Sequence, residues 1–242
     1  MPAADVAMPT GIAPNVLGYN TLEHDPLPYG LSREFIPDVA PAIIRFSNGT
    51  HHNGILYRNA DDKVFITHFA WDSDLRNDEY QGNYYYADMK ITKSEAKWIA
   101  AFVGEVARAD DNARIPYMIV DDPDVIFDSN GKWRPVDDFS GLTCATYVMI
   151  VFRCANSPLA DTSTWPIRKE DDVAQSTLVR RLAQDASTAH LAQYQQDKIG
   201  KCPRVRPEEV VGAALNSTLP ASFQEAEKNG EWVITVISAS PI

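Results

Sequence analysis

The chain has 242 residues and a formal net charge of −11, which disfavours a nucleic-acid backbone or an anionic membrane surface as its main partner. Hydrophobic residues make up 45% of the chain, which supports a packed core and excludes a disordered protein. The three cysteines, Cys144, Cys154 and Cys202, are too few for a disulfide framework and match no zinc-binding spacing. We therefore expect a folded protein from a reducing compartment.

The first residues and the hydropathy of the chain predict its location. The first ten residues contain neither a basic segment nor an apolar run, so we expect no signal peptide. No stretch reaches the ~18 uncharged apolar residues that a membrane-spanning helix requires. A cytoplasmic protein is the simplest expectation, and export without a signal is the alternative.

Residues 1–41 are rich in proline, which predicts an extended arm. The arm would lie over a single domain formed by residues 42–242. Within this domain, residues 52–58 and 63–71 alternate as strands do, and the turn composition of residues 59–62 joins them into a hairpin. Residues 72–83 are charged and read as a loop, whereas the aromatic residues 84–91 predict a further strand.

The sequence after residue 91 predicts several helices and one final strand. Thr92 and Glu95 have the spacing of a capping box, which starts a helix that ends near residue 109. Residues 171–199 form a polar helical segment, a solvated helix or helix pair on the surface. A short helix covers residues 206–215, where proline suits the first turn. The β-branched run at residues 231–238 predicts a final strand.

Cys144 stands where a polar lead-in meets an almost continuous apolar run. Ser140 can cap a helix over residues 142–153, and the apolar residues around most of its circumference predict a central, buried helix. A cysteine in the first turn lies where unpaired N–H groups and the helix dipole favour a thiolate. The sequence therefore indicates a nucleophile, with a small core residue as the alternative.

A thiol enzyme also needs a histidine within hydrogen-bonding reach of its sulfur. His51, His52 and His68 all fall in the hairpin, and its register decides which two meet. If Arg58 pairs with residue 62, His52 lies directly across from His68. If Arg58 pairs with residue 63, His51 shares a sheet face with His68 and His52 points away. Either pair could supply a base and a second ring that orients it.

Two motifs resemble the circularly permuted NlpC/P60 (papain-like) group, which includes bacterial YiiX-like hydrolases and lecithin:retinol acyltransferase-like enzymes. Residues 52–68 (HNGILYRNADDKVFITH) resemble its first motif, which runs from one histidine through a strand and an acidic turn to a second. Residues 141–148 (GLTCATYV) stand in the place of its cysteine motif. The order, histidines before cysteine, is the permuted one.

The resemblance implies an α+β fold with an antiparallel sheet packed on a central helix that carries the cysteine at its N-terminus. It implies Cys144 as nucleophile, His52 as general base and His68 as the orienting residue, and it selects His52 because Gly54-Ile55 falls at the matching offset. The expected activity is a cysteine hydrolase that cleaves an amide, peptide or ester bond without a metal or cofactor.

Three alternatives stay open at this point. A lipid acyltransferase or phospholipase and a deamidase share the chemistry, whereas a non-catalytic binding protein would keep only the fold. Two weaker sites are a zinc site around His51, His52 and His68 with nearby acids and a cation site at residues 121–124. A solvated turn explains the latter better. The partner we expect is a peptide, amide or acyl substrate; the oligomeric state stays undetermined.

Overall fold

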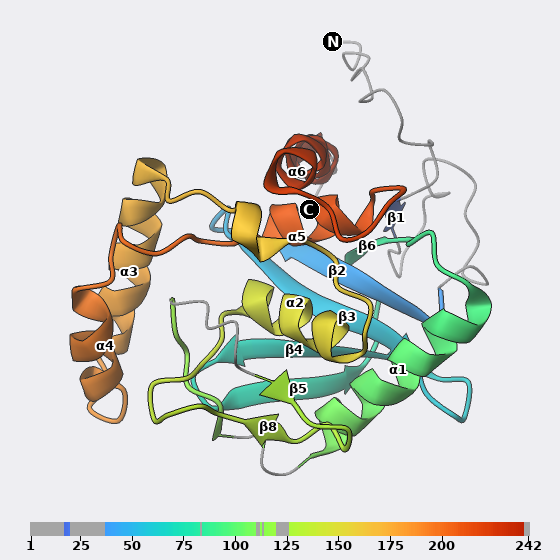
Figure 1. Ribbon diagram of the computed structural model, residues 1–242, viewed down its shortest axis with the longest axis horizontal. Coiled ribbons are helices and arrows are strands. Elements are labelled where there is room, and N and C mark those ends of the chain that lie inside the picture. The colour runs from blue at the N-terminus through green and yellow to red at the C-terminus, as the bar shows by residue number, and fades with distance from the viewer. Residues whose placement is uncertain are drawn as a thin grey trace.

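The computed structural model describes residues 17–19, 37–82, 84–109, 112, 114–119 and 126–239. Its centre is a six-stranded antiparallel sheet with the strand order β1-β6-β2-β3-β4-β5 (Figure 1). The strands are β1 (Leu17–Tyr19), β2 (Val39–Arg45), β3 (His51–Arg58), β4 (Val64–Trp71), β5 (Asp74–Glu79) and β6 (Tyr85–Ala87). Two short strands, β7 (Ile126–Phe127) and β8 (Trp133–Arg134), form a separate ribbon.

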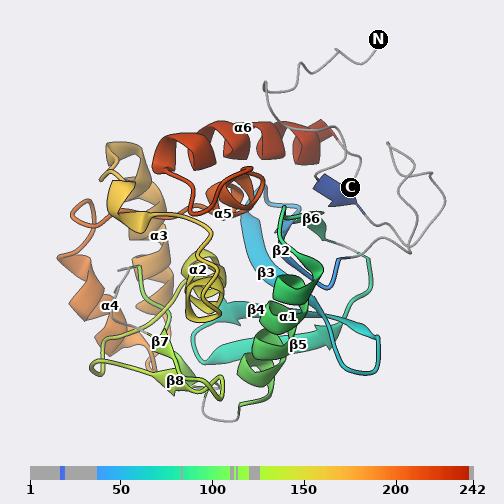
Figure 2. The ribbon, with the colours of Figure 1, turned by 45° about the vertical axis from the view of Figure 1, so that its right-hand side comes forward.

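Six α-helices accompany the sheet within the described residues. They are α1 (Lys93–Arg108), α2 (Cys144–Cys154), α3 (Asp172–Leu182), α4 (Ala189–Gln196), α5 (Pro207–Ala214) and α6 (Phe223–Ala239). Helices α1, α2 and α5 pack on one face of the sheet, α6 lies over α5, and α3 and α4 stand together at one side (Figures 1 and 2). The α+β class and the antiparallel sheet expected from the sequence are therefore confirmed.

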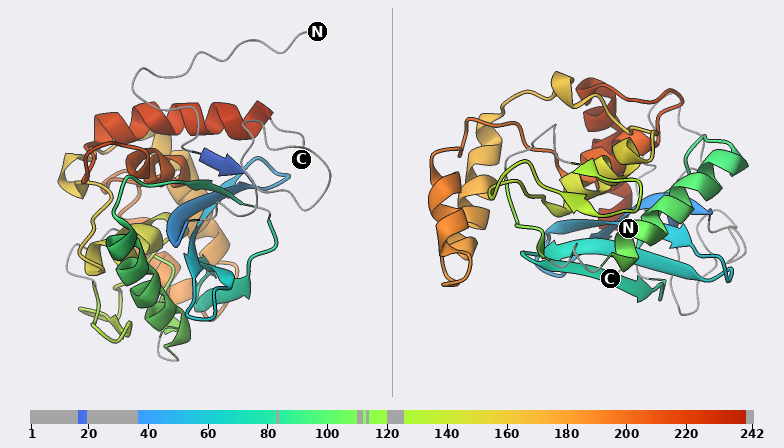
Figure 3. Two further views of the ribbon diagram at one scale, coloured as in Figure 1. Left: turned by 90° about the vertical axis from the view of Figure 1, so that its right-hand side faces the viewer. Right: turned by 60° about the horizontal axis from the view of Figure 1, so that its bottom comes forward.

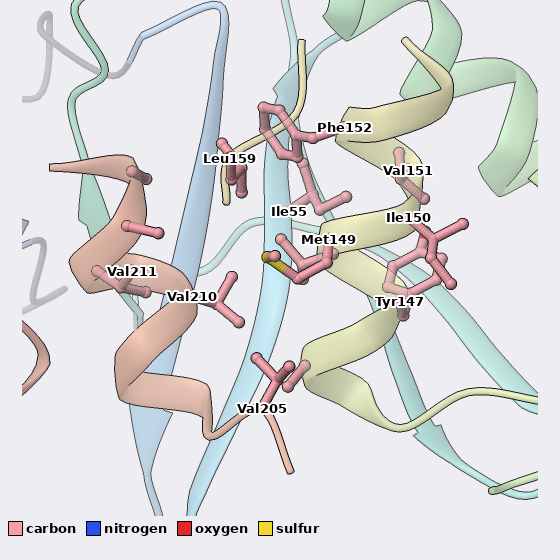
Figure 4. Close-up of a cluster of buried hydrophobic side chains, with 14 of the residues drawn as sticks. Ile55, Tyr147, Met149, Ile150, Val151, Phe152, Leu159, Val205, Val210 and Val211 are labelled. Carbon is pink, nitrogen blue, oxygen red and sulfur yellow. The ribbon is translucent and has the colours of Figure 1, made fainter. Parts of the chain in front are cut away.

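The main core lies between the sheet and these helices. Met149 of α2, Val210 of α5 and Ile55 of β3 meet there, and Figure 4 shows the two helices side by side over the strand. A smaller cluster, with Leu56, Ile66 and Tyr86, lies on the opposite face. Because side chains alternate along a strand, odd-numbered residues of β3 face α2 and even-numbered ones face away.

Several predicted elements form with shifted bounds. Helix α1 starts where expected, since the Thr92 side chain accepts from the Glu95 N–H at 3.2 Å, but the Glu95 carboxylate bonds Ser157 instead of completing a capping box. Residues 171–199 give the helix pair α3 and α4. Strand β2 begins at Val39, so the last residues of the predicted arm belong to the sheet, whereas most of the arm lies outside the described residues.

Two predictions of local structure are wrong. Residues 74–79, read as loop, form the edge strand β5, where charged side chains suit an edge that faces solvent. Residues 231–238, read as a strand, belong to helix α6, which buries Ala226, Val233 and Ile237 on one face. Tertiary packing overrides the β propensity of that run, because its apolar residues also fit helical spacing.

The contact between α5 and α6 is close enough to involve backbone atoms. A Cβ added at Gly212 would lie 2.3 Å from the Ala226 carbonyl oxygen and 2.5 Å from the Gly230 nitrogen. Only glycine permits this approach, so Gly212 lets the final helix lie against α5 (Figure 3).

Candidate active site

His52 and His68 meet across β3 and β4. The Nε2 atom of His52 lies 2.9 Å from Nδ1 of His68, and the ring centroids are 5.0 Å apart at an interplanar angle of 85°. The turn between the strands has an odd length, as the resemblance implies, but Arg58 pairs with Val64 rather than with residue 62. The two rings are therefore diagonal neighbours on one sheet face instead of direct partners.

Both imidazoles are neutral near physiological pH. Burial lowers the pKa of His52 to about 3, with further lowering by His68 and Arg76. Burial also lowers the pKa of His68, against the nearby Asp78 carboxylate, which raises it. A neutral imidazole retains a lone pair on one ring nitrogen and can accept a proton.

Cys144 is the first residue of α2, and the cap before it is not the one expected. Thr143, not Ser140, caps the helix: its side chain accepts from the Thr146 N–H at 3.1 Å, while the Thr143 N–H donates to the Thr146 hydroxyl at 2.7 Å. Ser140 instead accepts from the N–H groups of the preceding turn. The reciprocal cap fixes the position of the cysteine.

The Cys144 thiol is buried, with 8% of the residue exposed. Burial raises its pKa, and this outweighs the Asn53 N–H, the Arg204 charge and the Tyr117 hydroxyl, which lower it. The lowered pKa expected from the helix N-terminus is therefore wrong, because loss of hydration dominates. The surroundings of the sulfur are nonetheless polar.

The end of a strand pairing explains how the thiol comes to lie against β3. The Phe46–Thr50 and Arg58–Asp38 backbone hydrogen bonds show which residue pairs of β2 and β3 are hydrogen-bonded. Because such pairs alternate along an antiparallel ladder, Ile43 and Asn53 form a non-hydrogen-bonded pair, and the Asn53 N–H points away from β2. The β3–β4 ladder ends at Ile55–Thr67. The Asn53 N–H is close enough to the thiol to lower its pKa, so the start of α2 meets β3 where β4 no longer pairs with it.

The structure brings the histidine pair and the thiol to the same part of the sheet without joining them. Among the described residues, no hydrogen bond links Cys144 to His52 or His68. His52 precedes Asn53 in the chain but points to the opposite sheet face. Tyr84 relates the two groups: its ring centroid lies 6.3 Å from that of His68, and its pKa is raised by burial and then by the Cys144 charge.

His51 lies on the face covered by α5. Its Nδ1 is 3.4 Å from the Glu208 carboxylate. Burial raises the pKa of Glu208, but the His51 contact and the Arg204 charge outweigh it and leave the pKa lowered. The His51 Nε2 is buried without a hydrogen-bond partner among the described residues. His51 is thus the second candidate base, as the sequence also allowed.

Sequence reasoning missed Tyr117 and Arg204. A parallel bridge between Tyr117 and Leu142 brings Tyr117 beside the segment that precedes Cys144. The Cys144 N–H and thiol are close enough to the Tyr117 hydroxyl to act on its pKa, although burial is the main cause that raises it. Arg204 is held by Asp171 at 3.1 Å. No local motif marks either residue, since both reach the site through long-range packing.

A pocket of about 480 Å³ opens on the histidine face of the sheet. His52 and His68 line it, together with Phe46, Trp71, Asp78 and Tyr84. Tyr84 thus lines a pocket, whereas Tyr86 packs in the core cluster on that face. The pocket gives a small ligand access to the two imidazoles.

The other predicted sites do not gather around these residues. The acidic residues 121–124 lie outside the described residues. Within the described ranges, no cluster of three or more histidine, cysteine or acidic side chains could hold a metal ion. Across those ranges, every helix is too short or too polar to span a bilayer.

Comparisons of the chain with protein-family models, with curated proteins and with solved structures found no match. The geometry of the site therefore carries the functional argument.

Proposed function

We propose that the protein is a cysteine hydrolase with a permuted papain-like fold, in which Cys144 is the nucleophile, His52 the general base and His68 the residue that orients it. The observation that carries the proposal is the position of the thiol beside the strand that bears His52, at the end of the β3–β4 ladder. The Cys144 thiol, at the start of a buried helix, lies against the N–H of the residue that follows His52, and His52 is bonded to His68 at 2.9 Å.

The histidine contact assigns the reacting nitrogen. The Nε2 of His52 is engaged by His68, so the Nδ1 of His52 is the nitrogen left to take the thiol proton. Burial keeps this ring neutral, so it retains a lone pair that can accept a proton. A pKa of about 3 makes it a weak base in this state, and substrate binding must raise that pKa for the transfer to occur. The thiolate then attacks a carbonyl carbon, the leaving amine or alcohol takes the proton from His52, and water hydrolyses the acyl-enzyme.

Donors for the developing oxyanion are present beside the thiol. The backbone N–H groups at the start of α2 have no intrahelical acceptor. The Tyr117 hydroxyl lies beside the Cys144 N–H and thiol. Groups aimed at the oxyanion stabilise the transition state more than the ground state. Tyr117 and the Cys144 N–H are the donors that we assign to this role.

The raised pKa of the Cys144 thiol means that the nucleophile forms only when substrate binds. Cys144 rests as a neutral thiol because burial disfavours its charge, and no ion pair with a histidine stabilises a thiolate in advance. Because the His52 ring lies on the opposite sheet face, proton transfer to it requires a rearrangement at the end of the β3–β4 ladder when substrate binds. An amide or peptide bond is the first substrate we propose, and an ester or acyl-transfer substrate the second.

The experiment is hydrolysis of a panel of peptide anilides, esters and glutamine amides by matched variants. Cys144→Ala abolishes turnover, and His52→Ala lowers kcat/KM by at least about 100-fold. His51→Ala is the discriminating variant, since it removes the second candidate base, which lies on the other sheet face. If His51→Ala abolishes turnover and His52→Ala does not, the base assignment is wrong. Ligand binding without turnover would favour a binding protein.

A further inference from the structure

Asp78, on the edge strand, makes an ion-pair contact with one member of the histidine pair. The pairings His68–Arg76 and Ile66–Asp78 make Asp78 a diagonal neighbour of His68 on the same sheet face. Its carboxylate lies 3.8 Å from the Nε2 of His68. Asp78 makes no other ion pair with a described residue, whereas Arg76 is bonded to Asp74 at 2.6 Å.

A chain of contacts results, from Asp78 through His68 to His52. A carboxylate only accepts hydrogen bonds, so its charge favours the proton of His68 on Nε2, the nitrogen that faces it. The Nδ1 of His68 is then an acceptor. His52 must donate to it from Nε2, 2.9 Å away, which leaves the Nδ1 of His52 with a lone pair.

We infer that Asp78 is a positioning residue that selects the tautomers of His68 and His52, so that the Nδ1 of His52 is the basic nitrogen. The tautomers follow from the contacts alone. Their role in catalysis rests on the proposed function. Asp78 is thus a third functional group beside the two histidines, and no sequence motif indicates it.

Other charged groups around the pair do not supply this selection. The titratable and charged groups that surround His68 in the pocket are His52 on β3, Asp74, Arg76, Asp78 and Glu79 on β5, Tyr84 before β6 and Arg181 on α3. Arg76 is cationic and cannot accept a proton from a ring. Asp74 is occupied by Arg76, and Arg181 lies over the Trp71 ring at 4.3 Å.

Nitrogen-15 NMR of histidine-labelled protein tests the inference without any need for activity, because the two tautomers of a neutral imidazole differ in which nitrogen is protonated. In the wild type, His68 and His52 should both be protonated on Nε2. Asp78→Asn should populate the other tautomer of His68. Asp61→Asn makes the same substitution in the exposed turn between β3 and β4, outside the pocket, and it should leave the spectrum unchanged.

Two results overturn the inference: a His68 protonated on Nδ1 in the wild type, or an Asp78→Asn spectrum identical to that of the wild type. The Asp78 side chain is 66% exposed, so the variant should fold, and near-UV circular dichroism checks this. In the hydrolysis assay, Asp78→Asn should lower kcat about tenfold with KM unchanged. Correct tautomers in an inactive wild type would sink the proposed function while sustaining the tautomer assignment.

Discussion

The Nε2 atom of His52 and the Nδ1 atom of His68 are 2.9 Å apart, although the two residues are diagonal rather than opposite in the sheet. The register between Arg58 and Val64 produces this offset. The contact is partly buried, and the burial of His52 has a measurable consequence for the pH dependence of stability.

Acid should destabilise the protein through His52. Its pKa falls from 6.5 when unfolded to about 3 when folded, so below pH 6.5 the unfolded chain binds a proton that the folded chain does not. Stability is complete above pH 6.5 and is lost as the pH falls towards 3. We expect His52 to account for roughly 2 kcal/mol of the loss between about pH 7 and about pH 5.

Urea unfolding at both pH values measures this loss. In His52→Gln the pH dependence should shrink by that amount, whereas His190→Gln, on the exposed surface of α4, should behave as the wild type does. Equal pH dependence in the wild type and His52→Gln would contradict the buried neutral imidazole.

Gly212 should tolerate no side chain. Gly212→Ala places a Cβ 2.3 Å from a backbone oxygen of α6, which cannot move without shifting the helix, so we expect a loss of about 3 kcal/mol in the free energy of unfolding. Gly104→Ala is the matched control in α1, because its nearest atom, 3.2 Å away, is the flexible end of Arg108. That variant should gain up to about 1 kcal/mol.

The comparison is made by thermal and urea unfolding of both variants. Similar stability of Gly212→Ala and Gly104→Ala would mean that α6 does not pack against α5 as described.

The Thr143 cap should contribute to both stability and site geometry. Thr143→Ala leaves the Thr146 N–H without its acceptor and should cost about 1 kcal/mol. Thr143→Ser retains the hydroxyl and should recover most of the loss. Thr235→Ala, at an exposed site within α6, should change stability little. If Thr143→Ser is as unstable as Thr143→Ala, the hydroxyl is not the cause.

Glu209 should be far more important than its neighbour Glu227. The Glu209 carboxylate is 2% exposed and is bonded to Arg168, to the Trp165 indole at 3.1 Å and to the Arg206 N–H at 2.9 Å. Glu209→Ala leaves Arg168 buried with only part of its partners and should cost about 3 kcal/mol. Glu227→Ala removes a carboxylate that is 43% exposed and should cost less than about 0.5 kcal/mol. Comparable losses in urea unfolding would show that burial does not govern this network.

Secondary-structure elements that are specified by a few neighbouring residues could be predicted from the sequence. The Thr92 cap, the proline at position 207 and the alternating hairpin each specify structure within a few residues. Residues 231–238 could not be assigned this way, because their β-branched side chains favour a strand until α5 offers a surface for a helix. The charged strand β5 was missed for a related reason: it forms by pairing with β4.

The candidate site could be predicted only in part. The histidine pair follows from alternation along two adjacent strands, and its contact is confirmed. The pKa of Cys144 could not be read from its place at a helix N-terminus, since burial acts in the opposite direction. Tyr117 and Arg204 come from distant segments that only the packed fold brings close to the thiol, whereas Asp78 lies on β5, a strand that the sequence did not predict.

The most direct test of the account is the capture of an acyl-enzyme. Intact mass spectrometry and peptide mapping after brief reaction with activated esters and amides should find one acyl group on Cys144 in the wild type. The adduct should be absent from Cys144→Ala, retained in His51→Ala and formed at least about 100-fold more slowly in His52→Ala. Acylation of Cys154 or Cys202 instead, or an unchanged rate in His52→Ala, would contradict the assignment of Cys144 and His52.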